Sequence, residues 1–198
     1  MEHYFTPKPK SNIRKQSFKT RILGNEIIIN SSSGIFSVKE IDFGTRLLIE
    51  NAKINGKQLL DLGCGYGIIG IALKKNNPEI ELTMIDINER AVSSAKENCV
   101  SNNVEAIVLC SDIFSHPEIR NRIFDTILTN PPFSAGKKIC FQFIEESAKH
   151  LNTGGLFQLV APHNKGGESL KKKMLEVFGN AGEITKKAGY RVYISIKK

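Results

Sequence analysis

The 198-residue sequence contains no apolar run that approaches the roughly 18 residues needed for a membrane span. Its first ten residues, MEHYFTPKPK, lack the apolar stretch of a secretory signal. No internal repeat or low-complexity tract occurs. With 40% hydrophobic and 24% charged residues, the composition is typical of a soluble globular protein with one buried core. We therefore expect a cytoplasmic protein without membrane association, built from one domain and a small extension.

Cysteine and histidine are scarce, with four of each. Cys64, Cys99, Cys110 and Cys140 form no C-x-x-C pair, and the histidines are scattered along the chain. Neither residue type has the spacing of a zinc site, so no metal is expected. The cysteines are predicted to be reduced thiols, most of them buried.

Acidic residues are outnumbered by basic ones, 20 against 28, which gives a net charge of +8. Such an excess favours a polyanionic partner, usually nucleic acid, although a generally basic surface is the simpler explanation. The basic residues concentrate towards the two ends, and residues 8–21 hold six of them without one acid. Asp61, Asp86 and Asp112 lie in the middle of the chain. This distribution predicts an anion-binding rim around a pocket for a cation.

Strand and helix patterns alternate from residue 57 onwards. Strands are predicted at 58–62, 81–85, 106–109, 125–129, 156–161, 182–186 and 191–196, and helices at 68–75, 89–101, 140–151 and 168–178, the second helix capped by Asn88. Such alternation predicts a mostly parallel sheet with helices on both faces. The last two strands are joined too closely for a parallel crossover and should be antiparallel.

Residues 1–56 precede the alternation of strands and helices. They are predicted to form an extension that packs on a main domain at 57–198. Polar and apolar residues alternate around Gly24-Asn25, which predicts two short strands joined by a turn there. A helix is predicted at 42–52.

The stretch DLGCGYGIIG, residues 61–70, can be interpreted in two ways. From Gly65 to Gly70 it fits the dinucleotide fingerprint G-x-G-x-x-G, which holds a pyrophosphate. From Asp61 to Gly67 it has one acid followed by a glycine at every second position, a pattern that would hold a cationic sulfonium cofactor. Both interpretations place the glycines directly after a strand, where open α/β sheets bind ligands. Close packing of helix on strand without any ligand is a third explanation.

Acids at three successive strand ends favour a cationic ligand. A pyrophosphate beside Asp61 would meet a like charge, with a repulsion on the order of 4 kcal/mol at about 4 Å and an effective dielectric of 20. S-adenosylmethionine carries no phosphate, and its sulfonium and ammonium groups are cations. Asp86 alone does not discriminate, because nicotinamide dinucleotides also place an acid on the ribose. Asp61 and Asp112 therefore decide for the sulfonium cofactor.

The segments LLDLGCGYGIIGIAL and MIDINERAVSSAKENC resemble the Rossmann-like, S-adenosylmethionine-dependent methyltransferases. The resemblance implies an α/β fold with a seven-stranded, mostly parallel sheet, an antiparallel last strand and helices on both faces, over residues 57–198. The implied cofactor contacts are Asp61, Gly63, Gly65 and Gly67 for the methionine part, Asp86 for the ribose hydroxyls, Asp112 for the adenine, and Cys64, Ile87, Ile113 and Asn130 as further contacts.

Asn130-Pro131-Pro132-Phe133 follows the fourth predicted strand of this unit. Alone it predicts only a rigid turn. Beside the glycine loop it can grip a planar amine, because the Asn130 oxygen and the Pro131 carbonyl are two acceptors for an exocyclic NH2. Phe133 offers a stacking face, worth about 1–3 kcal/mol per base. Such a grip would orient the amine towards a methyl donor, which is catalysis by positioning and electrostatics.

The tetrapeptide resembles the signature of methyltransferases that act on adenine N6, guanine N2 or glutamine amides, and Phe133 leans towards nucleic acid bases. HYFTPKP, SSSGIFS and DFGTRLLIE further resemble the catalytic module of the small-subunit ribosomal RNA guanine N2-methyltransferases. Bacterial members often carry a second, degenerate methyltransferase-like domain, and none is expected in this sequence. The resemblance implies a ribosomal RNA or small-subunit substrate, catalysis by Asn130 to Phe133, and a place near the pocket for Phe36 and Phe43-Gly44-Thr45.

The target base is expected to leave its stack, while the N-terminal basic segment and Lys137-Lys138 hold phosphates, so that salt weakens binding. Four alternatives remain open. Adenine N6 or a protein glutamine could be the acceptor, the chain could be a nicotinamide-dependent oxidoreductase, or it could be an RNA-binding factor without activity.

Overall fold

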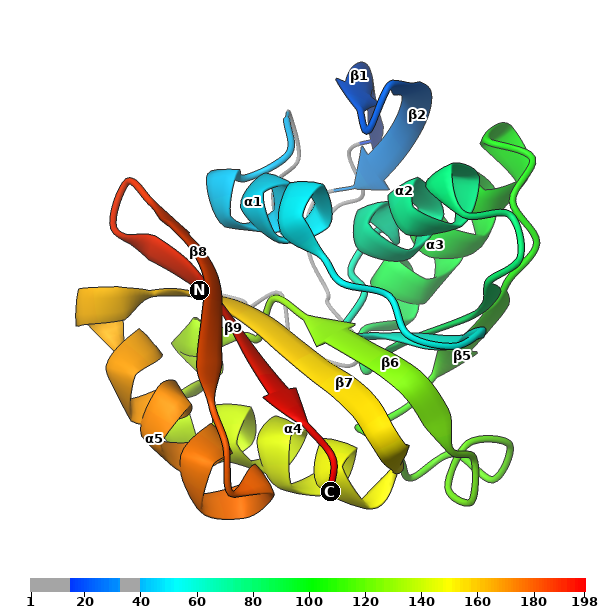
Figure 1. Ribbon diagram of the computed structural model, residues 1–198. Coiled ribbons are helices and arrows are strands. Elements are labelled where there is room, and N and C mark those ends of the chain that lie inside the picture. Colours follow the sequence, from blue (N-terminus) through cyan, green and yellow to red (C-terminus); the bar gives the residue numbers. More distant parts are fainter. Residues whose placement is uncertain (1–14, 33–39) are drawn as a thin grey trace.

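The computed structural model describes residues 15–32 and 40–198 (Figure 1). Its main element is a seven-stranded sheet of order β5-β4-β3-β6-β7-β9-β8. The strands of this sheet are β3 (Gln58–Leu62), β4 (Glu81–Asp86), β5 (Ile107–Cys110), β6 (Phe124–Thr129), β7 (Leu151–Pro162), β8 (Gly182–Lys187) and β9 (Tyr190–Ile196). The helices are α1 (Phe43–Asn51), α2 (Ile68–Asn76), α3 (Glu89–Ser101), α4 (Lys137–Lys149) and α5 (Gly167–Phe178).

The sheet has the predicted mixed topology. The pairs from β5 to β7 are parallel, and β9 runs antiparallel to both of its neighbours, β7 and β8. In β3 the four successive residues from Leu59 to Leu62 are all buried, as expected for a strand covered on both faces. Leu59 belongs to one core cluster and Leu60 to the other, because neighbouring side chains point to opposite faces.

Helices cover both faces of the sheet, as predicted. In Figure 1, α1, α2 and α3 lie on one face and α4 and α5 on the other. The first core cluster contains side chains such as Leu47 of α1 and Ile71 of α2, and the second contains Phe143 of α4 and Met174 of α5. No helix within the described ranges has the length and apolarity needed to cross a bilayer. All four cysteines are free and three are buried, as predicted.

Several boundaries differ from the predictions. The first turn is at Leu23-Gly24, one residue earlier than expected, where both residues have positive φ (49° and 79°) between β1 (Lys15–Ile22) and β2 (Asn25–Ser32). Helix α4 begins at Lys137 instead of residue 140, so Lys137-Lys138 form its first turn and not a loop. Strand β7 begins at Leu151 instead of residue 156, and Gly154 and Gly155 exchange backbone hydrogen bonds with Lys197.

The β1–β2 hairpin is attached to α3 through two asparagine side chains. Asn98 accepts from Asn30 N (2.7 Å) and donates to Asn30 O (3.0 Å). Asn102 makes the same two-way contact with Ile28, at 2.9 and 2.7 Å. The four residue steps from Asn98 to Asn102 advance about 6 Å along the helix, and two strand residues advance about 6.6 Å. The two amides therefore match the spacing of the backbone groups at the edge of β2, as a neighbouring strand would. Asn98 also donates to Tyr66 O (2.9 Å), which couples the hairpin to the glycine loop.

We expect Asn98→Ala to lower the free energy of unfolding by about 2–4 kcal/mol, because it leaves backbone groups of β2 and the Tyr66 carbonyl without a buried partner. Urea denaturation measures this loss. The control is Asn76→Ala, at the exposed end of α2, which should change stability by less than about 0.5 kcal/mol. Equal stabilities for the two variants would show that the amide contacts do not anchor the hairpin.

Candidate cofactor and substrate site

The glycine loop between β3 and α2 turns sharply against the end of β4. Gly63 and Cys64 both donate to Ile85 O, each at 2.9 Å. Gly67 has φ 87°, and a Cβ there would meet Met84 Sδ at 3.2 Å. Gly65 has φ 57°, and a Cβ there would meet no atom within 4 Å. Gly67 is therefore needed for packing as well as for its backbone, whereas Gly65 faces open space.

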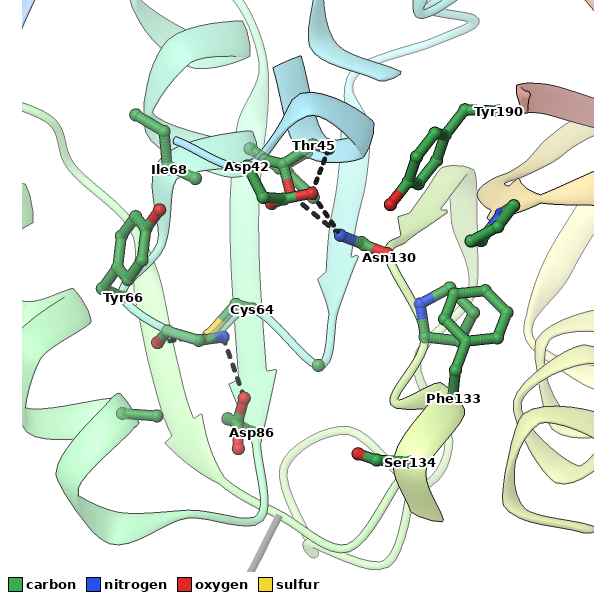
Figure 2. Close-up of a pocket in the computed structure, with 16 residues that line it drawn as sticks. Asp42, Thr45, Cys64, Tyr66, Ile68, Asp86, Asn130, Phe133, Ser134 and Tyr190 are labelled. Carbon is green, nitrogen blue, oxygen red and sulfur yellow. Dashed lines mark hydrogen bonds between the residues drawn. The ribbon is translucent and has the colours of Figure 1, made fainter. Parts of the chain in front are cut away.

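Two cavities lie where β3, β4 and β6 end. The larger, of about 340 Å³, is lined by the glycine loop, the first turn of α1, the segment after β6 and residues of the β7 and β9 ends (Figure 2). The smaller, of about 90 Å³, lies towards β5 and α4. Gly63, Asp86 and Asn130 line both cavities. These three residues join the cavities into one crevice at the predicted edge of the sheet.

Asp86 is fixed between the glycine loop and the start of α3. Its Oδ2 accepts from Gly65 N and its Oδ1 accepts from Asn88 N, both at 2.8 Å. Burial raises the pKa of this carboxyl, and the two backbone contacts act in the opposite direction. Asn88 itself is the predicted cap of α3, with its side chain accepting from Arg90 N at 2.9 Å. Asp86 can therefore present a fixed acceptor to hydroxyl groups in either cavity.

Asp61 occupies a different place from the expected one. Its side chain is 0% exposed and lines neither cavity. Its Oδ2 accepts from Gly70 N in the first turn of α2 (2.9 Å), and its Oδ1 has no partner among the described residues. Burial raises the pKa of Asp61 to about 7, with a smaller contribution from Asp86. The carboxyl lies beneath the glycine loop, one layer behind the cavity surface.

The smaller cavity contains the residues predicted to face the adenine. Ile87, Asp112 and Ile113 line it together with Pro132 and Phe143. Asp112 is exposed at its rim. Ile113 has φ 51°, a conformation that is strained for a β-branched residue. Strain of this kind often occurs at ligand sites.

Asn130 is held with its amide in one orientation. Its Nδ2 donates to Thr45 Oγ1 at 2.9 Å and lies 3.5 Å from Asp42 Oδ1. A carboxylate only accepts hydrogen bonds, so the amide nitrogen has to face Asp42 and the oxygen has to face away. Figure 2 shows Phe133 and Tyr190 on the opposite side of Asn130 from Asp42. Asn130 Oδ1 makes no hydrogen bond to the described residues and is available to a ligand.

The rest of the tetrapeptide forms a tight turn. Phe133 N donates to Pro131 O at 2.9 Å across Pro132, whose φ of −75° and ψ of 82° are those of an inverse γ-turn. The Pro131 carbonyl, expected to be a free acceptor, therefore already holds one donor and has one lone pair left. Phe133 lines the larger cavity and Pro132 the smaller. The turn thus contributes to the wall of each cavity.

Several lining residues were not expected from the sequence. Asp42 precedes α1 and was interpreted only as part of a helix, and Tyr190 lies 60 positions beyond Asn130. Thr45 lines the larger cavity as expected, whereas Phe43 does not and rests against the Tyr190 ring (5.5 Å between centroids). Phe36 and the HYFTPKP segment lie outside the described residues. Within those residues, no group of three or more His, Cys, Asp or Glu side chains could hold a metal ion.

The raised pKa of Asp61 predicts a pH-dependent stability. The folded-state pKa of about 7 lies above the unfolded value of 3.8, so the stabilisation is complete below pH 4 and is lost as the pH rises to 7. Between pH 5 and pH 7 the unfolding free energy should fall by about 1.4 kcal/mol per pH unit from this group. Urea denaturation at several pH values should show the slope in the parent and its loss in Asp61→Asn. Asp112→Asn on the exposed rim should keep it, and equal slopes for parent and Asp61→Asn would contradict the assignment.

The sequence matches the methyltransferase small domain family over residues 26–194. It is 39% identical over 201 residues to the protein YbxB of Bacillus subtilis, a match that covers all of this chain and 98% of that protein. It is also 39% identical over 168 residues to ribosomal RNA small subunit methyltransferase C of Mannheimia succiniciproducens, which covers 80% of this chain and 49% of that protein.

The fold matches the solved structure of the Thermus thermophilus 16S rRNA N2 G1207 methyltransferase (RsmC) in complex with AdoMet and guanosine. The TM-score is 0.80 at 29% identity, over 96% of this chain and 52% of that one. The chain thus spans about half the length of the ribosomal RNA methyltransferases it matches. Because the family model matches most of the sequence and both relatives cover most of the chain, the chain belongs to the methyltransferase small domain family.

Proposed function

We propose that the chain is an S-adenosylmethionine-dependent methyltransferase that modifies an exocyclic amine of an RNA base, most specifically guanine N2 in small-subunit ribosomal RNA. The observation that carries this proposal is the fixed amide of Asn130, whose free oxygen faces a cavity lined by aromatic rings. Support comes from the relatives named as ribosomal RNA methyltransferases and from the solved relative that holds AdoMet and guanosine. We further propose residues 57–198 as the catalytic domain and the cytoplasm, where the thiols stay reduced, as its location.

The crevice has the chemistry that S-adenosylmethionine requires. Asp86 would accept from the ribose hydroxyls, while the apolar walls at Ile87 and Ile113 and the Asp112 carboxylate would hold the adenine. The larger cavity would take the methionine part beside Gly63, Cys64 and Gly65. Its open face at Gly65 leaves room for a ligand to touch the backbone. When bound, the cofactor supplies an electrophilic methyl group on a sulfonium.

Asp61 argues against the dinucleotide alternative. In dinucleotide-binding folds the first N–H groups of the helix after the glycine loop point at a pyrophosphate. Here Gly70 N, in the first turn of α2, is already bound by Asp61 Oδ2 at 2.9 Å. A pyrophosphate at this helix start would displace that bond or meet the carboxylate. Gly70 also has a packing role, since a Cβ there would lie 2.8 Å from Met84 Sδ. The third glycine of the fingerprint is thus explained without any phosphate.

In the proposed reaction, Asn130 and its neighbours orient the amine. One N–H of the exocyclic amine would donate to Asn130 Oδ1 and the other to the remaining lone pair of Pro131 O, while Phe133 stacks on the base. This grip draws the nitrogen lone pair out of conjugation and aims it at the methyl carbon. The methyl group that the cofactor would supply could then be transferred to this nitrogen, and the amine proton would leave to solvent. The chain contributes orientation and electrostatics, and no strong base is required.

Binding of S-adenosylmethionine tests the cofactor assignment. We expect isothermal titration calorimetry to show that the parent chain binds S-adenosylmethionine and not NAD. Asp86→Asn should weaken the affinity about 10- to 100-fold, because hydrogen bonds to a charged carboxylate contribute about 1.5–3 kcal/mol. Glu105→Gln, an exposed residue outside both cavities, serves as the control and should bind like the parent. Tighter binding of NAD than of S-adenosylmethionine would overturn the proposal.

Methyl transfer tests the role of Asn130. Asn130→Asp keeps an oxygen at the cavity but places a second carboxylate about 3.5 Å from that of Asp42. Repulsion between the two carboxylates should turn or displace the substituted side chain. We expect the rate of methyl transfer to small-subunit ribosomal RNA to fall on the order of 100-fold. Labelled methyl groups are followed into RNA, and mass spectrometry of the digested nucleosides should find N2-methylguanosine.

The matched control is Asn76→Ala, which should retain the parent's rate. Full activity of Asn130→Asp would show that this amide does not grip the substrate. If the label is found in N6-methyladenosine or in a protein glutamine, that group is the acceptor and guanine N2 is not.

A further inference from the structure

A third cavity, of about 280 Å³, lies beside the candidate site, and its lining contains no acidic residue. Its polar lining side chains come from two segments: His163 and Asn164 after β7, and Lys186, Lys187, Tyr190 and Arg191 from the β8–β9 hairpin. His163 N donates to Gly189 O at 2.9 Å, which fixes the first segment on the tip of the second. Lys186 and Lys187 are exposed and form no ion pair with any described residue. The cavity is therefore flanked by two lysines that have no counter-charge among the described residues.

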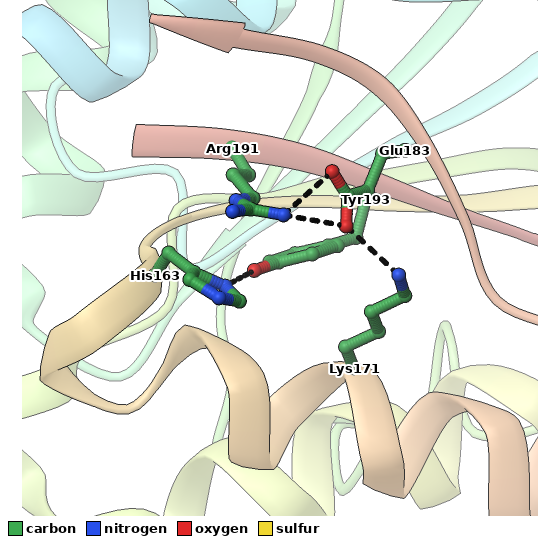
Figure 3. Close-up of polar contacts among 5 residues, drawn as sticks. All are labelled: His163, Lys171, Glu183, Arg191 and Tyr193. Carbon is green, nitrogen blue, oxygen red and sulfur yellow. Dashed lines mark hydrogen bonds and ion pairs between the residues drawn. The ribbon is translucent and has the colours of Figure 1, made fainter. Parts of the chain in front are cut away.

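The proton on His163 can be assigned by counting donors. His163 Nδ1 lies 2.8 Å from the hydroxyl of Tyr193, which is fully buried (Figure 3). That hydroxyl has no other hydrogen-bond partner among the described residues, and burial raises the pKa of Tyr193 to about 12. A buried hydroxyl proton needs an acceptor, so Tyr193 donates to Nδ1. The other ring nitrogen, Nε2, therefore carries a proton whenever the ring is neutral and is a hydrogen-bond donor in either state.

Arg191 is oriented in the same way. Its Nη1 donates to both oxygens of Glu183 at 2.8 Å, and Lys171 donates to Glu183 Oε1 at 2.8 Å (Figure 3). Arg191 Nε and Nη2 make no hydrogen bond within the described part of the chain. Glu183 does not line the cavity, and its charge is balanced by two cations. The guanidinium thus offers the N–H groups of two further nitrogens, Nε and Nη2, in a fixed position.

The hairpin places like charges together at a cost that an anion would remove. Lys186 lies directly opposite Arg191 in the register of β8 and β9, and like charges at such a position are destabilising. At the tip, Ala188 and Gly189 (φ 47° and 79°) form a two-residue turn of the same kind as Leu23-Gly24 in the first hairpin. The opposed cation pair at this hairpin end therefore favours a bound anion.

The third cavity adjoins the candidate active site. Tyr190 lines both, and Pro162 of the larger cavity is followed directly by His163 of the third. We propose that this cavity, formed by His163, Lys186, Lys187 and Arg191, binds a backbone phosphate of the RNA strand that carries the target base. The inference rests on the proposed function and adds the surface that holds the strand. A flipped nucleotide remains tied to its neighbours through phosphodiesters, so a phosphate site beside the base pocket sets the register of the strand.

The test is the double variant Lys186→Gln/Lys187→Gln, with Lys197→Gln/Lys198→Gln as a control. The control removes the same charge at the other end of β9, about 23 Å away. Binding to a small-subunit ribosomal RNA transcript is measured by fluorescence anisotropy across a salt series. We expect the site variant to weaken RNA affinity about tenfold at physiological salt and to lower the slope of log Kd against log salt by about 1, as for one lost phosphate contact. Both double variants should bind S-adenosylmethionine like the parent.

Steady-state kinetics give a second measurement. The site variant should raise the KM for RNA and leave kcat at saturating RNA unchanged, because the contact is made equally before and during methyl transfer. Equal RNA affinities and salt slopes for the site variant and the control would overturn the phosphate site. Micromolar binding of AMP that depends on Lys186 and Lys187 would also overturn it, because the site would then take a free nucleotide.

The two proposals fail separately. If the parent methylates RNA and the site variant matches the control in binding, the phosphate site is wrong and the proposed function stands. If RNA binding depends on Lys186 and Lys187 but no RNA accepts a methyl group, the phosphate site stands and the proposed function is wrong.

Discussion

The orientation of the Asn130 amide is the constraint on which the candidate site depends. An amide can be rotated by half a turn with little change in shape, and the two orientations offer opposite chemistry to a ligand. Asp42 removes this ambiguity, because its carboxylate lies 3.5 Å from Nδ2 and can only accept. The same oxygen, Asp42 Oδ1, caps α1 by accepting from Thr45 N at 3.0 Å. The same carboxylate oxygen therefore caps helix α1 and orients the proposed catalytic amide.

This coupling explains why the segment before residue 57 belongs to the working site. α1 supplies Asp42 and Thr45, and Gly44 allows the Tyr190 ring to approach, since a Cβ there would lie 3.0 Å from it. The hairpin before α1 contributes through α3, where Asn98 binds both β2 and the Tyr66 carbonyl. Removing the extension would leave the sheet covered on its other face, but it would release the groups that fix Asn130 and the glycine loop.

Local pattern predicted most of the fold and the centre of the site. Strand and helix periods gave the elements from residue 57, and the strand ends brought Asp86, Asn130 and the glycines together, because parallel strands share one carboxyl edge. Three features depended on tertiary structure. The direction of Asp61 is set by the face of β3 it occupies, the Pro131 carbonyl is engaged by a turn that needs Pro132 at ψ 82°, and Tyr190 arrives from the last strand. No local signal encodes such approaches between segments far apart in sequence.

The opposite charges of crevice and rim follow from a single requirement of the proposed reaction. A nucleotide brings a neutral base and a charged phosphate within one sugar of each other, and a methyl donor brings a positive sulfonium. The acids Asp86 and Asp112 in the crevice would attract the donor and repel phosphate, whereas Lys186, Lys187 and Arg191 beside it would attract phosphate. Only the base, which carries no charge, can pass from the basic rim to the acidic crevice without an electrostatic penalty. The acidic crevice and the basic cavity lie on either side of Tyr190. Their opposite charges would thus select the base as the part of the nucleotide that enters the crevice, before any hydrogen bond identifies it.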